Sequence, residues 1–333
     1  MAQLGTFTAD QAAELAIVTR SGFVESRHVG SAVVLDQHGE VQRSIGAPEA
    51  PVFPRSSLKP FQAIAVMNAG VQLRGPQAVL ATASHAGTMR HMSTVRAMLT
   101  TAGLPEDALQ CPPAFPGDQA TRDEMVRQGV GPQRIAMNCS GKHAAMLLAC
   151  VANGWDAASY LHPEHPLQRA VRDTVERFTG EKPVATAVDG CGAPVFAISL
   201  IGLARGIARV RTSSATSPFA IYRNAGALVD AVLEDPWAIE GPGRPNTVVI
   251  ERLGVFAKLG AEGVMVMAAR DGTTVALKVL DGSGRASTLV GLELLVAAGA
   301  LPRQEVDDVL EQLDLTITGG GEPVGRIEVS PTL

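Results

Sequence analysis

The hydrophobic pattern along the chain predicts strands near both ends and helices between them. Near the N-terminus, apolar runs flank a His38-Gly39 turn, as in a β-hairpin. Near the C-terminus, an Asp271-Gly272 turn gives a strong hairpin signal. The segments that we expect to be strands are Leu15–Val18, Ser31–Asp36, Glu40–Ile45, Gly254–Lys258, Val264–Ala269 and Thr273–Leu280.

In the middle of the chain, apolar residues recur at helical spacing, and glycines or prolines separate the segments. An N-terminal hairpin can pair with a C-terminal one, so we expect an α/β (α+β) chain with one antiparallel sheet. Residues 1–333 would form a single domain, with sheet-forming parts near 1–55 and 245–333 and a mainly helical part near 56–244. The expected helices are Phe61–Gly70, Pro76–Ala83, Val95–Ala102, His143–Ala152, Leu167–Phe178, Pro194–Ile207, Ile221–Leu233, Leu289–Ala298 and Glu305–Leu313.

Composition narrows the class of protein. The chain is 46% hydrophobic and 18% charged, with a net charge of −5, which is typical of a globular protein. Without a basic cluster, neither nucleic acid nor an anionic membrane is an expected partner. No apolar stretch is long enough to span a bilayer, and the N-terminus lacks a signal-peptide pattern. With only four cysteines, we expect a cytoplasmic enzyme with reduced thiols.

The motif Arg55-Ser56-Ser57-Leu58-Lys59-Pro60 carries the first candidate chemistry. Residues three apart share a helix face, so Lys59 can lie beside Ser56 and take its proton if the amine is held neutral. Pro60 is tolerated only near the first turn of a helix, where free N–H groups also favour an oxyanion. The alternative is a helix N-cap serine without catalytic function.

Four further polar clusters follow in the sequence. A turn or a helix end would explain the glycines and prolines in them, and a lone Lys-x-Gly is weak evidence. Together with Ser-x-x-Lys, however, a central serine and a late Lys-x-Gly resemble the arrangement of serine β-lactamases and penicillin-binding proteins. The clusters are Ser84-His85-Ala86-Gly87, Asn138-Cys139-Ser140-Gly141-Lys142-His143, Asp189-Gly190-Cys191-Gly192-Ala193-Pro194 and Lys258-Leu259-Gly260.

Charged residues near these motifs suit a free amino acid as substrate. Arg55 is a natural fork for a carboxylate, and Asp189 is a natural partner for an ammonium. The two could instead form a structural ion pair. His143 could bind substrate or cap its own helix, and we include Gly190, beside Asp189, among the substrate-binding candidates.

In these five motifs, which run in order from Arg55 to Gly263, the chain resembles the bacterial L-asparaginases of the thermolabile, rhizobial type. The resemblance implies a serine-β-lactamase-like fold, a homodimer, and hydrolysis of L-asparagine to L-aspartate and ammonia. It implies two Ser-Lys tandems, Ser56 with Lys59 and Ser84 with Lys258. Repulsion between the two ammonium groups could then leave one lysine as base and the other as acid.

The resemblance also implies a metal site, usually zinc, on Cys139, Lys142 and Cys191. Thiolates suit zinc, whereas a lysine can be a ligand only after losing its proton. The metal is not required for the Ser-Lys chemistry, and the alternative is a pair of buried cysteines beside a charged lysine.

Two other functions fit the same residues. One is a glutaminase or another β-lactamase-like Ser-Lys hydrolase. The other is a non-catalytic protein that binds an amino acid or zinc. Two intact Ser-Lys pairs argue against the second, because a binding protein has no use for a lysine of depressed pKa.

Overall fold

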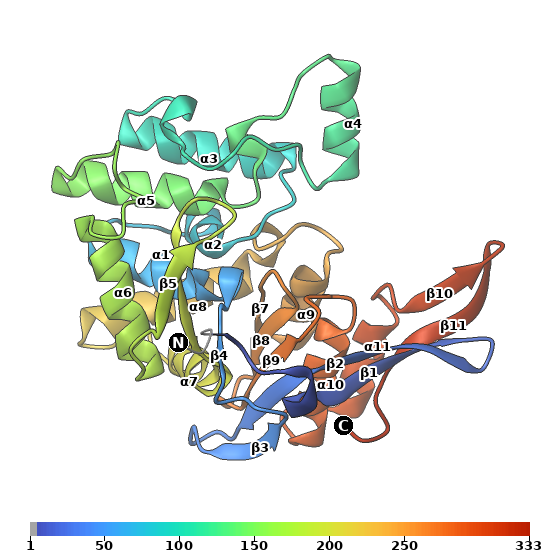
Figure 1. Cartoon of the computed structure of the whole chain (residues 1–333). Coiled ribbons are helices and arrows are strands. Elements are labelled where there is room, and N and C mark those ends of the chain that lie inside the picture. The colour runs from blue at the N-terminus through green and yellow to red at the C-terminus, as the bar shows by residue number, and fades with distance from the viewer. Residues whose placement is uncertain (1–4) are drawn as a thin grey trace.

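An antiparallel sheet joins the two ends of the chain in the computed structural model, which describes residues 5–333. The strand order is β10-β11-β1-β2-β9-β8-β7, with β3 paired to β2 (Figure 1). The N-terminal strand β2 therefore lies beside the late strand β9, with Ala32 opposite Leu277. The strands are β1 (Ala13–Arg20), β2 (Phe23–Leu35), β3 (Val41–Ile45), β7 (Phe256–Leu259), β8 (Val264–Ala268), β9 (Thr274–Val279), β10 (Thr316–Gly319) and β11 (Glu322–Val329).

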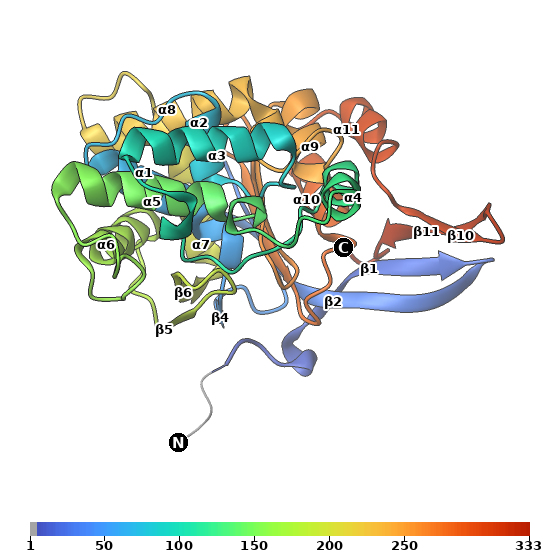
Figure 2. The same cartoon turned by 90° about the horizontal axis from the view of Figure 1, so that it is seen from above.

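Most of the helices lie between β3 and β7 in the sequence, and the last two helices follow β9. Most of them gather on one side of the sheet, away from the projecting ends of β1, β2, β10 and β11 (Figures 1 and 2). They are α1 (Lys59–Asn68), α2 (Pro76–Thr82), α3 (Met89–Ala102), α4 (Gln119–Arg127), α5 (Ser140–Asn153), α6 (Pro166–Thr179), α7 (Leu200–Arg211), α8 (Ala220–Glu234), α9 (Pro245–Leu253), α10 (Ser287–Ala297) and α11 (Arg303–Leu310). Among the helices of the described chain, none has the length and apolar character to span a bilayer.

The middle of the sheet forms much of the core. Every residue of β8 and β9 is buried, and α7 and α10 pack against both strands. A second, three-stranded sheet has the order β4-β6-β5, where β4 is Pro51–Val52, β5 is Ala185–Val188 and β6 is Pro194–Ser199. Its β5–β6 turn carries the Asp189 motif.

The expected architecture, an antiparallel sheet from both ends with helices between, is confirmed. One element was wrong: the predicted helix Pro194–Ile207 is strand β6 followed by helix α7. All six residues of β6 are buried, so its side chains show no polar alternation that would mark a strand. Strands β10 and β11 and the first half of β2 were not predicted, because mostly exposed or half-exposed residues form them.

Candidate active site

The hydroxyl group of Ser84 lies between two lysine amines. Lys59 Nζ is 2.9 Å from Ser84 Oγ, and Lys258 Nζ is 3.0 Å from the same oxygen. Lys59 is the first residue of α1 and Lys258 lies in β7, whereas Ser84 follows the end of α2. Both amines also donate to backbone carbonyls, Lys59 to Ala83 at 2.5 Å and Lys258 to Leu259 at 2.7 Å.

The environment of Lys258 favours a neutral amine. Both lysine side chains are buried, while Ser84 is only half-buried. Burial, assisted by the positive charge of Lys59, lowers the pKa of Lys258 to about 7; the carboxylate of Glu240 opposes this shift. Lys258 can therefore gain or lose a proton near neutral pH, as general acid–base chemistry requires.

The sequence predicted Ser56 at the start of a helix. In the structure Ser56 lies in a short 3-10 turn, Arg55–Leu58, that leads directly into α1. The sequence predicted a contact between Lys59 and Ser56, and the structure places the Lys59 amine elsewhere. Lys59 donates to Ala83 and Ser84, and within residues 5–333 the hydroxyl of Ser56 forms no hydrogen bond. A buried ammonium needs strong acceptors, and the extended segment after α2 supplies them. The half-buried Ser56 hydroxyl is left free.

Two contacts lock the Ser56 turn against β7. Ser57 Oγ donates to the carbonyl of Lys258 at 3.1 Å. The second contact is between the backbones of Gly260 and Pro54, and it explains the glycine of the Lys-x-Gly motif. A Cβ at Gly260 would lie only 2.5 Å from the carbonyl oxygen of Pro54. Only glycine allows this approach. The two backbone segments that carry Ser56 and Lys258 are thus held side by side.

Arg55 and Asp189 form an ion pair, with 2.6 Å between Arg55 Nε and Asp189 Oδ1. Their side chains are 24% and 10% exposed, so the pair is largely desolvated. Gly190 N donates to the same carboxylate oxygen at 2.9 Å. Because only Nε is used on Asp189, the two terminal nitrogens of the guanidinium remain for another partner.

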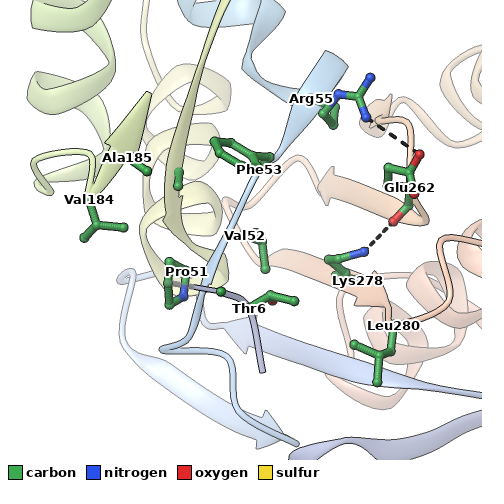
Figure 3. Close-up of a pocket in the computed structure, with 12 residues that line it drawn as sticks. Thr6, Pro51, Val52, Phe53, Arg55, Val184, Ala185, Glu262, Lys278 and Leu280 are labelled. Carbon is green, nitrogen blue, oxygen red and sulfur yellow. Dashed lines mark hydrogen bonds and ion pairs between the residues drawn. The ribbon is translucent and has the colours of Figure 1, made fainter. Parts of the chain in front are cut away.

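One of those terminal nitrogens faces Glu262, at 3.7 Å (Figure 3). The backbone carbonyl of Glu262 accepts from Lys278 Nζ at 2.7 Å. Arg55 and Glu262 are both non-glycine residues with positive φ, +53° and +61°, a strained conformation that their surroundings hold in place. Arg55, Glu262 and Lys278 line one end of a pocket of about 350 Å³ that also contains Phe53.

His143 lies on α5 and points into the interior. Its Nδ1 is 2.6 Å from the hydroxyl of Tyr160, and its Nε2 is buried without a hydrogen-bond partner in the described chain. Burial lowers the pKa of this imidazole, although nearby Cys191 partly opposes the shift. His143 therefore does not cap its own helix, and its buried imidazole lies beside Cys191.

The three predicted metal ligands lie together beneath this region. Lys142 Nζ is 3.0 Å from Cys191 Sγ. Cys139 and Cys191 are both buried and form no disulfide. A hydrogen bond from Cys139, opposed by burial and assisted by Lys142, holds the pKa of Cys191 far below its usual range. Burial lowers the pKa of Lys142, but the thiolate of Cys191 more than compensates and the net shift is upward.

Two thiols and an amine match the soft donor set that zinc prefers, if Cys139 and Lys142 lose their protons. Residues 5–333 contain no group of three or more His, Cys, Asp or Glu side chains suited to a metal ion. A group of only His, Cys, Asp and Glu cannot include the predicted site, because one of its three donors is a lysine, Lys142. Zinc here stays a prediction.

Sequence reasoning missed a group of supporting residues. Asn246 Oδ1 accepts from the backbone of Leu259 at 3.2 Å, and Glu240 Oε2 accepts from Asn246 N at 3.0 Å. Tyr160, the partner of His143, was also missed. None of these residues belongs to a recognisable motif, and only the packing of distant segments brings them to the site.

The site combines the groups that a serine amidohydrolase needs: two hydroxyls, a lysine of near-neutral pKa and a charged pair for an amino acid. The sequence agrees with this class. The family model for L-asparaginase II matches residues 16–329, and the chain belongs to this family. Membership supports an amidohydrolase. No curated protein matches the chain.

Solved structures similar to this one are distant in sequence. The crystal structure of Mglu in its glutamate form is 12% identical with a TM-score of 0.46, covering 89% of this chain. The chain spans 65% of the length of that protein. A β-lactamase from Mycobacterium bovis is 15% identical with a TM-score of 0.42, and the match covers 82% of this chain and 95% of the other.

Proposed function

We propose that the protein hydrolyses L-asparagine to L-aspartate and ammonia through an acyl-enzyme on Ser56. The single observation that carries the proposal is the Ser84 hydroxyl held by Lys59 and Lys258. A structural serine has no need of two buried amines, whose desolvation is costly. Such an arrangement is useful where a proton must pass between groups.

Arg55 and Asp189 bind the amino-acid end of the substrate in this proposal. The terminal nitrogens of Arg55 take the α-carboxylate, and the carboxylate of Asp189 takes the α-ammonium, with Gly190 fixing Asp189 and His143 Nε2 as a further donor or acceptor. In asparagine the carboxylate and the side-chain amide are only a few bonds apart. The attacking hydroxyl must therefore lie near Arg55, and Ser56 is the adjacent residue.

Proton transfer follows the chain of contacts that Lys59, Ser84 and Lys258 form. Lys59 accepts the proton of Ser56 as it attacks, after passing its own proton through the Ser84 hydroxyl to Lys258. Lys258 can accept it because its pKa lies near 7. The same route, reversed, delivers a proton to the departing nitrogen, and water then hydrolyses the acyl-enzyme.

Zinc on Cys139, Lys142 and Cys191 belongs to the proposal as a structural ion. When bound, it would replace the protons of Cys139 and Lys142 and fix Cys191 and its neighbours Asp189 and His143 around the substrate. A homodimer is likewise proposed from the resemblance, and sedimentation of the purified protein tests it.

The decisive experiment measures ammonia release from asparagine and glutamine and ring opening of a chromogenic β-lactam, in wild type and in Ser56→Ala. We expect asparagine to be the preferred substrate and Ser56→Ala to lose turnover while its circular dichroism is unchanged. Mass spectrometry of enzyme quenched with asparagine should place the aspartyl group on Ser56. An acyl group on Ser84 would overturn the nucleophile, and saturable asparagine binding without product would favour a binding protein.

A further inference from the structure

Ser84 lines a hollow that the proposed reaction with asparagine does not use. Its volume is about 380 Å³, whereas a molecule the size of ammonia or water occupies about 30 Å³. We call it the Ser84 hollow. Its polar and aromatic lining comes from Ser84, His85, Phe115, Asn138, Glu240 and Arg244.

Backbone hydrogen bonds hold the rim of the Ser84 hollow in place. Ala86 N donates to the carbonyl of Glu240 at 2.6 Å, and Asp118 N donates to the carbonyl of Ala86 at 2.8 Å. Arg244 Nη2 closes the rim by donating to the carbonyl of Gly117 at 2.7 Å. The hollow is therefore formed before any ligand arrives, which lowers the cost of binding.

The outer end of the Ser84 hollow carries one cation, Arg244, near the carboxylates of Glu240 and Asp118. Glu240 is engaged, because one carboxylate oxygen accepts from Asn246 N at the start of α9. Arg244 is exposed and forms no ion pair within the described residues, so its remaining N–H groups can reach a ligand. A guanidinium with free donors is suited to a carboxylate.

The position of Ser84 decides which part of a substrate enters this hollow. Ser84 and Lys258 deliver the proton to the leaving nitrogen in the proposed function, on which this inference rests. Whatever is attached to that nitrogen must extend past Ser84. We propose that the protein also hydrolyses β-aspartyl amides whose amine portion is an amino acid, with the carboxylate of that amino acid on Arg244.

The reaction balances as amide hydrolysis with water as the only co-reactant. Ser56 Oγ bonds to the β-carbonyl carbon, the carbon–nitrogen bond breaks, and the nitrogen takes a proton from Lys258 through Ser84. The amino acid leaves through the Ser84 hollow. Water then attacks the ester, which returns the Ser56 hydroxyl and releases aspartate.

The test compares three substrates: L-asparagine, N4-methyl-L-asparagine and β-aspartyl-glycine. The methyl derivative enlarges the leaving group without adding a carboxylate. Wild type should release glycine from β-aspartyl-glycine. In Arg244→Gln, the ratio of kcat/KM for β-aspartyl-glycine to that for N4-methylasparagine should fall at least tenfold. Arg252→Gln, at an exposed arginine of α9, the helix that begins just after Arg244, should keep the wild-type ratio.

The outcomes separate the two proposals. Turnover of asparagine without glycine release from β-aspartyl-glycine overturns this inference alone, as does an unchanged ratio in Arg244→Gln. Cleavage of β-aspartyl-glycine but not of asparagine supports the leaving-group site and overturns the proposed substrate. If no substrate is cleaved, both proposals fail. Circular dichroism of the two variants confirms that the compared proteins are folded.

Discussion

Lys59 and Lys258 hold one hydroxyl group between them, at 2.9 and 3.0 Å, although they are separated by 199 positions in the sequence (258 − 59). Lys59 raises the cost of charging Lys258, since like charges in a buried site repel. This relationship makes the site sensitive to pH and to any change that separates α1 from β7.

Catalysis should follow the ionisation of Lys258. Its pKa is about 7, so the amine is protonated below that pH and free to accept a proton above it. We expect kcat/KM for asparagine to rise with pH through about 7 and then level off. Lys258→Met should lower kcat/KM at least a hundredfold, as loss of a general base does. An unchanged pH profile in that variant would show that another group titrates.

Folding stability should depend on the same lysine. Its folded pKa of about 7 lies below the ordinary value of 10.5, so between these pH values the unfolded chain binds more protons. The free energy of unfolding therefore rises with pH across this window, by up to about 1.4 kcal/mol per pH unit from this group. Urea titrations of wild type and Lys258→Met at pH 7 and 9.5 measure it. The variant should lose this contribution, whereas Lys182→Met, at an exposed position, should retain it.

Arg55 and Asp189 should act as a unit on substrate affinity. Arg55→Lys keeps the charge but loses the fork, and we expect KM for asparagine to rise roughly tenfold or more. Asp189→Asn should have a similar effect. The double variant should cost less than the sum, because the two side chains are in contact. Arg74→Lys serves as an exposed control. Strict additivity would indicate that the residues do not share a ligand.

The zinc prediction is tested by metal content. Wild type purified without chelator should carry zinc, and Cys191→Ala should lose it and raise KM more than it lowers stability. Cys150→Ala is the matched control, because Cys150 is a buried, free thiol on the same helix as Lys142. Elemental analysis and unfolding curves give both readouts. Metal-free wild type with unchanged kinetics would exclude a role for the ion in substrate binding.

Gly260 should be intolerant of substitution. The added methyl group of Gly260→Ala would lie 2.5 Å from the carbonyl oxygen of Pro54, so the backbone must shift. Such overpacking costs about 1–3 kcal/mol, and it would also move Lys258 relative to Ser56. Thermal unfolding and ammonia release measure the two effects. Gly284→Ala, where nothing lies within 4 Å of the added carbon, should change neither.

Local patterns predicted the fold better than they predicted the site. Turns such as Asp271-Gly272 and helical periodicity depend on neighbours in sequence, so strands β8 and β9 and most helices were found. Strand β6 was taken for a helix because all of its side chains are buried. Exposed strands such as β10 carry little apolar signal at all.

In the site, spacing brought attention to Ser56 and Lys59, but spacing alone could not reveal that Lys59 points to Ser84. That contact depends on how α1 packs beside the end of α2. Glu240 and Arg244 lie in no motif, and a Gly-Pro-Gly segment between them, 241–243, gave no chemical signal. Their place beside Ser84 comes from the backbone pairing of Ala86 with Glu240.

The central position of β2, between β1 and β9, has a consequence for biosynthesis. One edge of β2 has no strand partner until residues 274–279 of β9 have left the ribosome. Lys258, on β7, joins the sheet only through β8 and β9. A nascent chain halted before β9 should therefore be inert toward substrate and prone to capture by chaperones. Enzymatic competence would arrive abruptly, once β9 has left the ribosome and paired with β2, rather than growing with chain length.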